Sequence, residues 1–85
     1  MLKLSERKLQ RWHQNDQIEK IIYAAKNGTY QIRLQSVRLL GDHFRDISVK
    51  NQLIEMIDDE VELVANAAIS LFNETTDQSI VLRIR

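Results

Sequence analysis

The histidines are the first side chains to consider for chemistry, because the chain has no cysteine to act as a nucleophile or thiolate ligand. His13 and His43 each stand in a polar stretch, the first near Asp16 and the second beside Asp42. A zinc site needs three or four converging protein ligands, and neither stretch supplies them. We interpret both as exposed histidines at helix corners, with a packing role for the ring, and expect no metal ion.

Carboxylates form the second group, since Asp58, Asp59 and Glu60 are consecutive and Glu62 follows closely. Paired carboxylates can serve in acid–base catalysis or hold a cation, but the alternating ligand pattern of a calcium loop is missing. Acidic side chains also favour the positive end of a helix. We therefore expect Asp59, with Glu62 three positions later, to start a helix without forming a site.

Sequence motifs of enzymes are absent, because the chain has no glycine-rich phosphate loop, no H-E-x-x-H pair and no nucleophile elbow. Its 85 residues also leave little room for a deep substrate cleft beside a core. We predict a protein that is not an enzyme and uses no cofactor. Without cysteine or an apolar run of roughly 18–20 residues, it is predicted to be cytoplasmic, alone or as part of a larger, membrane-anchored protein.

Charge is balanced overall, with twelve basic and twelve acidic side chains. A nucleic-acid-binding domain normally carries a basic excess, so the balance argues against one. Residues 1–27 carry six basic and three acidic side chains, and residues 59–85 carry two basic and five acidic. Two interpretations stay open: a chance distribution, or a basic end that stacks on the acidic end of a similar chain and forms a homo-oligomer.

The basic end contains Lys3, Arg7, Lys8 and Arg11 beside Trp12. Such a helix could meet an anionic membrane or a nucleic acid. Its apolar residues are few, so we favour a solvated helix face, with Trp12 covering an open edge of the core.

Helices are expected to position these side chains, because proline is absent and glycine occurs only twice. The first clear helix is predicted to start at an Asp16 N-cap and to end at Asn27-Gly28 in the left-handed conformation. Thr29 is a suitable N-cap for the next helix, which is predicted over 30–40. So short a connection places the two helices antiparallel.

Apolar and small residues at helical spacing define the inward faces. Those of the first helix pair are Ile18, Ile21, Ile22 and Ala25, then Ile32, Ser36, Leu39 and Leu40. Those of the second pair are Val49, Leu53, Met56 and Ile57, then Leu63, Ala67, Ser70 and Leu71. A last helix is expected after Asn73, capped by Thr75 or Thr76 and carrying Ile80 and Ile84.

A 31-residue shift superimposes the two pairs and matches Ile32 with Leu63, Ser36 with Ala67 and Leu40 with Leu71. A fixed period of this size is typical of stacked repeats. We predict an all-α fold over 1–85, an α-α superhelix with two full repeats, 15–45 and 46–76, between partial repeats at 1–14 and 77–85. Two incomplete ends indicate a piece of a longer protein or a module that packs on another.

Residues 32–41, IRLQSVRLLG, resemble the inner helix of a HEAT repeat, hydrophobic-Arg-x-x-small-x-x-small-Leu-Gly. Residues 63–71, LVANAAISL, follow the pattern again, although Val64 stands in place of the family's arginine. Residues 53–59, LIEMIDD, are similar to the end of the outer helix. The 31-residue shift is closest to the short, bilin-lyase-like HEAT repeats. The resemblance implies a solenoid that binds proteins along a groove.

In such a solenoid the second helix of each pair lines the groove. The outward residues there are predicted to be Arg33, Gln35, Arg38, Val64, Asn66 and Ile69. The arginines could grip a carboxylate of a protein partner, because guanidinium presents a planar fork of donors. We therefore predict a protein-binding scaffold. A nucleic-acid-binding helical repeat and an accessory segment of an enzyme such as a bilin lyase are the alternatives.

Overall fold

The computed structural model describes the backbone of residues 4–84 and the side chains of residues 4–73. Over this part of the chain every regular element is a helix, and no strand occurs. The elements are α1 (Glu6–Gln14), α2 (Ile18–Asn27), α3 (Tyr30–Leu40), the 3-10 helix η1 (Gly41–His43), α4 (Ile47–Met56) and α5 (Glu62–Ile84). The predicted all-α class is confirmed.

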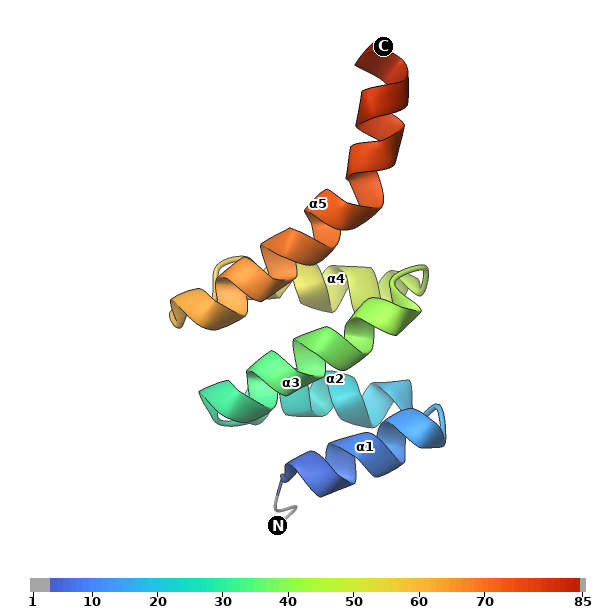
Figure 1. Cartoon of the computed structure of the whole chain (residues 1–85). Helices are drawn as coiled ribbons and strands as arrows, with labels where there is room; N and C mark the ends of the chain where they lie inside the picture. Colours follow the sequence, from blue (N-terminus) through green and yellow to red (C-terminus); the bar gives the residue numbers. More distant parts are fainter. Residues whose placement is uncertain (1–3, 85) are drawn as a thin grey trace.

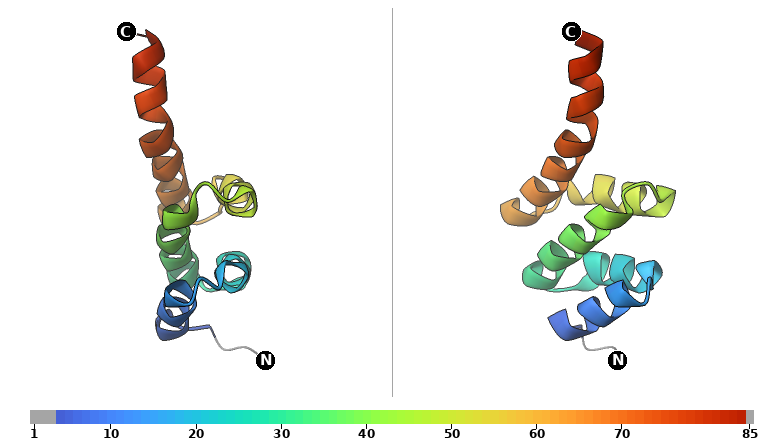
Figure 2. Two further views of the ribbon diagram at one scale, coloured as in Figure 1. Left: turned by 90° about the vertical axis from the view of Figure 1, so that its right-hand side faces the viewer. Right: turned by 45° about the vertical axis from the view of Figure 1, so that its right-hand side comes forward.

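The helices run back and forth across the molecule (Figure 1) and form two layers (Figure 2). One layer contains α1, α3 and the first part of α5, and the other contains α2 and α4. Within the layers, α3 contacts both α1 and α5, and α2 contacts α4. Because α3 also contacts α2 and α4, it touches each of the other α-helices.

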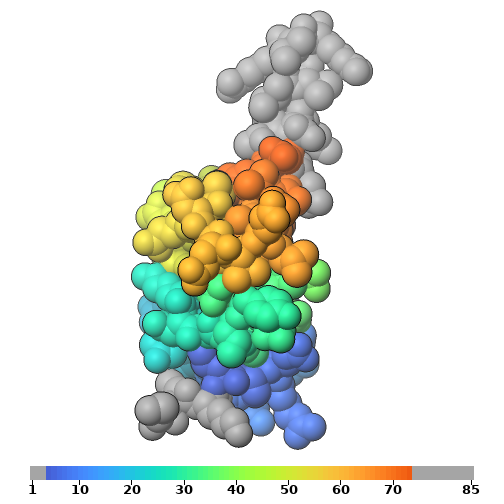
Figure 3. All heavy atoms as spheres, turned by 90° about the vertical axis from the view of Figure 1, so that its left-hand side faces the viewer, coloured from blue at the N-terminus to red at the C-terminus, as the bar shows by residue number. Residues whose placement is uncertain are grey.

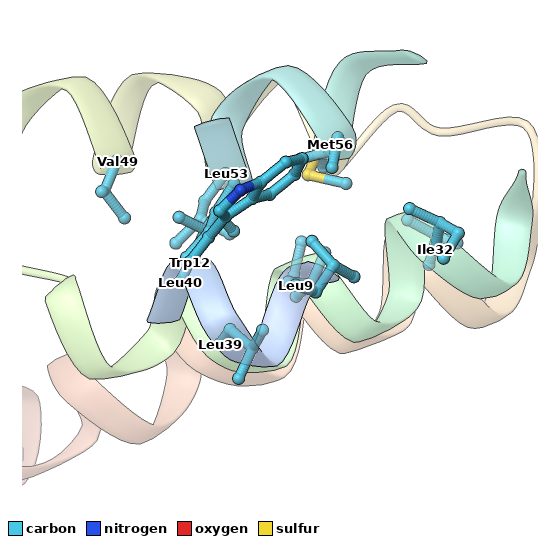
Figure 4. Close-up of a cluster of buried hydrophobic side chains, with 14 residues drawn as sticks. Leu9, Trp12, Ile32, Leu39, Leu40, Val49, Leu53 and Met56 are labelled. Atoms are coloured by element: carbon cyan, nitrogen blue, oxygen red, sulfur yellow. The ribbon is translucent and has the colours of Figure 1, made fainter. Parts of the chain in front are cut away.

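The core lies between the two layers and is one continuous cluster of buried side chains (Figure 4). Leu9 and Trp12 of α1 belong to the same cluster as Leu40 of α3 and Leu53 of α4. Trp12 is only 6% exposed, and the amine of Lys20 lies 5.9 Å from the centre of its ring. The predicted role of Trp12 in the core is confirmed.

The turns on either side of α2 differ from their predictions. Asp16 has a φ of 55° and lies in the turn before α2, whose N-cap is Gln17. Gly28 is extended, with φ −79° and ψ 171°, and not left-handed. It leads directly to Thr29, whose Oγ1 accepts a hydrogen bond from the backbone nitrogen of Ile32 at 3.4 Å. The predicted Thr29 N-cap is confirmed.

The 31-residue shift does not describe the burial of the second helices. Leu63, which that shift matches with the buried Ile32, is 60% exposed. Its neighbour Val64 is fully buried. A 32-residue shift restores the match, since it pairs Ile32 with Val64 and Ser36 with Ala68, all of them buried.

Unequal turns explain this difference in register. Two residues join α2 to α3, whereas five residues, 57–61, join α4 to α5. Consequently the interval between the starts of α3 and α5 is three residues longer than the interval between the starts of α2 and α4. The helix period alone could not reveal the three additional turn residues, because either register places apolar side chains on the inner face.

The predicted helix end near Asn73 is wrong, because α5 continues without interruption to Ile84. The side chains of Thr75, Thr76, Ile80 and Ile84 lie outside the described residues. The division into two full and two partial repeats stays a prediction. No helix in the described part of the chain is long and apolar enough to cross a membrane.

Candidate functional site

Arg33 makes three hydrogen bonds within its own chain. Its Nε and Nη2 donate to Oδ2 and Oδ1 of Asp59 at 2.9 and 3.0 Å, and its Nη1 donates to the carbonyl oxygen of Gly28 at 2.9 Å. The side chains of Arg33 and Asp59 are 17% and 10% exposed. Arg33 therefore joins the α2–α3 turn to the α4–α5 turn, and its guanidinium is not free to grip a partner's carboxylate.

The ion pair favours the charged form of both members. The hydrogen bond from Arg33 lowers the pKa of Asp59, and the same interaction raises the pKa of Arg33. Oδ1 of Asp59 also accepts a hydrogen bond from the backbone nitrogen of Val61 at 2.9 Å. Asp59 thus holds the turn before α5, which begins at Glu62 and not directly after Asp59 as predicted, and it additionally binds an arginine 26 residues away.

Val64 cannot line a binding surface, because it is fully buried. The prediction that placed it outward followed from the 31-residue shift. In the observed register Leu63 takes the outward place, and its 60% exposure is large for a leucine.

The other predicted residues of α3, Gln35 and Arg38, lie on the side of the helix that points away from α2 and α4. Positions at i, i+3, i+4 and i+7 share one side of a helix, and α3 and α5 contact each other within one layer (Figure 2). Their outward positions therefore form one surface, which we call the α3–α5 face. It comprises the exposed Gln31, Arg38, Leu63, Asn66 and Ser70, with the half-buried Gln35 and Leu34 beside them, of which Leu34 also packs against the core.

Ile69 lies on another side of α5. On α3, the line Arg33, Val37 and Gly41 faces α5, since Arg33 reaches the turn before α5 and a Cβ on Gly41 would lie 2.8 Å from Leu71 Cδ2. Val37, in the middle of that line, is 1% exposed. The 32-residue shift matches Val37 with Ile69, which is 37% exposed. Ile69 thus marks the side of α5 that is turned away from α3.

The two histidines lie together at the edge formed by the α1–α2 and α3–α4 turns. Their ring centroids are 5.5 Å apart in an edge-to-face arrangement, and Nε2 of His13 lies 3.4 Å from Oδ2 of Asp42. Both histidines are half-buried and not exposed as predicted, whereas the contact between their rings agrees with the predicted packing role. Among the described residues no cluster of three or more potential ligands could hold a metal ion.

Gln52 is a buried polar residue and was not among the predicted site residues. It is 4% exposed, and its Oε1 is buried without a hydrogen-bond partner. A signal was present, because Gln52 stands three residues after Val49 and four before Met56, within an apolar stripe. Buried polar groups normally have partners, so an exception indicates strain, an ordered water or a bound ligand.

Comparison with protein-family models, with curated proteins and with solved structures finds no match to this chain.

Proposed function

We propose that this chain is a short HEAT-like solenoid that binds another protein through the α3–α5 face. The observation that carries the proposal is the composition of this face. It combines a largely exposed leucine, Leu63, with an exposed arginine, Arg38, on two helices that contact each other.

The contacts between helices support the solenoid. Each described α-helix contacts the helix that follows it, and α1, α2 and α3 also contact the helix after that one. Such contacts between near neighbours are typical of helical repeats. The HEAT-like pattern of residues 32–41 falls on α3, the helix at the centre of these contacts.

The chemistry of the α3–α5 face favours a protein as partner. Apolar and arginine side chains are enriched in protein interfaces, and amides and hydroxyls around them can form hydrogen bonds with a partner's backbone. Arg38 is the one charged residue of the face. A nucleic acid would need several cations there, so the nucleic-acid alternative receives no support from this surface.

Site-specific photo-crosslinking in cells would test the proposal. A photoreactive amino acid replaces Arg38 or Asn66 on the face, and the controls carry it at Glu19 or Asn51, exposed positions on α2 and α4. We expect discrete protein adducts at 38 and 66 but not at 19 and 51. Leu63→Asp should abolish those adducts without changing the melting temperature.

Equal labelling of both layers would contradict the proposal, because binding would then not involve the α3–α5 face. Adducts with nucleic acid at positions 38 and 66 would instead establish the alternative.

A further inference from the structure

A shallow cavity of about 540 Å³, open to solvent, lies at the edge of the molecule where the α2–α3 and α4–α5 turns are found. Figure 3 looks onto this edge. Lys26 of α2, Gln52 and Glu55 of α4, and the turn residues 58–60 line the cavity, together with Arg33. None of these residues belongs to the α3–α5 face.

The lining of the cavity is acidic. Its charged residues are four carboxylates and two cations, Lys26 and Arg33, which leaves a net charge of −2. The ion pair with Arg33 neutralises Asp59. The carboxylates of Glu55, Asp58 and Glu60 therefore face only one further cation within the lining, and a ligand for this cavity should be positively charged.

Gln52 indicates that the ligand is also a hydrogen-bond donor. Gln52 is one of the residues that line the cavity, and its buried Oε1 lacks a hydrogen-bond donor. The terminal torsion of glutamine has a broad energy minimum, so the amide can turn toward a group in the cavity. A donor bound there would satisfy an acceptor that otherwise stays unpaired at a cost in stability.

We propose that this cavity binds an arginine side chain of a partner protein, held by the carboxylates of Glu55, Asp58 and Glu60 and by the amide oxygen of Gln52. The inference rests on the proposed function, and it names the chemistry of a second contact with the partner. A guanidinium group fits because it carries a fixed charge and five N–H donors, enough to reach several carboxylates and an amide.

Nuclear magnetic resonance with the isotope-labelled 85-residue chain tests the proposal, with a tetra-arginine peptide as the probe. We expect the peptide to shift the side-chain amide signal of Gln52 and the backbone signals of Glu55 and Glu60. A tetralysine peptide of equal charge should bind roughly tenfold more weakly, because an ammonium group cannot reproduce the planar donor pattern.

Matched variants separate the cavity from general charge attraction. Glu55→Gln/Glu60→Gln should weaken tetra-arginine binding roughly tenfold, since it removes two charge-assisted hydrogen bonds. Glu6→Gln/Glu19→Gln removes the same charge from exposed positions outside the cavity and should have little effect. Equal weakening by both pairs would overturn the proposal.

Gln52→Met provides a second readout that does not depend on charge. The variant should bind tetra-arginine less tightly, yet the unliganded variant should melt at the same or a higher temperature, because the unpaired acceptor has been removed. Unchanged binding by Gln52→Met, or displacement of the peptide by Mg²⁺, would overturn the assignment.

Sedimentation velocity identifies the source of the arginine. We expect the chain alone to remain monomeric. Self-association that disappears in Arg7→Gln/Arg11→Gln would show that a second copy supplies the arginine and would overturn its assignment to a different protein. Leu63 does not line the cavity. The crosslinking test of the α3–α5 face can therefore succeed or fail independently of the peptide-binding tests of the cavity.

Discussion

The ion pair between Arg33 and Asp59 connects two turns and is largely shielded from solvent. We expect Arg33→Met and Asp59→Asn each to lower the free energy of unfolding by about 1–3 kcal/mol, because each leaves a charged partner unsatisfied. The double variant should lose less than the sum of the two. Urea unfolding of the four proteins measures this coupling, and strict additivity would show that the pair does not contribute as a unit.

Acid should weaken the same interaction. Arg33 lowers the pKa of Asp59 in the folded chain, so the stability from Asp59 is complete above its unfolded pKa and is lost as the pH falls through the folded pKa. The urea midpoint should therefore fall on acidification less steeply for Asp59→Asn than for the unchanged chain. Asp46, whose pKa is lowered by its hydrogen bonds with Ser48, should contribute to the decline of the urea midpoint that remains in Asp59→Asn.

Residue contacts could be predicted only where they are local. The Thr29 N-cap was predictable because its partner, Ile32, is three residues away and the rule depends on helix geometry. The partner of Arg33 was not predictable, since Asp59 approaches Arg33 only when the two helix pairs stack. Gln52 could have been noticed, but its neighbours in space, and hence the cavity, depend on the same stacking.

At the scale of elements, the two glycines differ in what a methyl group would meet. At Gly28 a Cβ would collide with Cγ2 of Ile32 and would lie 2.8 Å from the backbone oxygen of Ala24, which cannot easily move. At Gly41 it would approach only the end of the Leu71 side chain. We expect Gly28→Ala to lower the melting temperature clearly, whereas Gly41→Ala should change it little. Similar melting temperatures for the two variants would show that the α2–α3 turn can widen.

Helix existence was predictable for α2, α3, α4 and the start of α5, because their apolar periodicity is strong. The register of α5 was not predictable, because its inner face contains apolar and small residues in both the 31-residue and the 32-residue register. The length of the turn before it decided the register, and turn length is not encoded in helix periodicity. For the same reason the inner face of α3, which follows a short turn, was predicted correctly, whereas the predicted positions of Leu63 and Val64 were the reverse of those observed.

At the scale of the whole molecule, α3 contacts every other described α-helix, so its loss should unfold the domain in one transition. Leu40→Asp places a carboxylate at a fully buried position of α3, where it lacks a partner. We expect loss of cooperative melting, followed by far-ultraviolet circular dichroism. Leu63→Asp, at a position that is 60% exposed, should melt like the unchanged chain. Loss of cooperative melting in Leu63→Asp as well would restore the 31-residue register.

The two turns of unequal length give the helix pairs different tolerance to insertion and deletion. Deletion of either residue of the first turn would remove a structural contact, since Gly28 accepts a hydrogen bond from Arg33 and Thr29 caps α3. In the second turn Asp59 is bonded to Arg33 and Val61, and the carbonyl oxygen of Val61 accepts hydrogen bonds from Val64 and Ala65, whereas Ile57 and Asp58 bond back to the last residues of α4. Evolutionary changes in length should therefore accumulate in the second turn, so that related chains could differ in spacing there and still enclose the same interior.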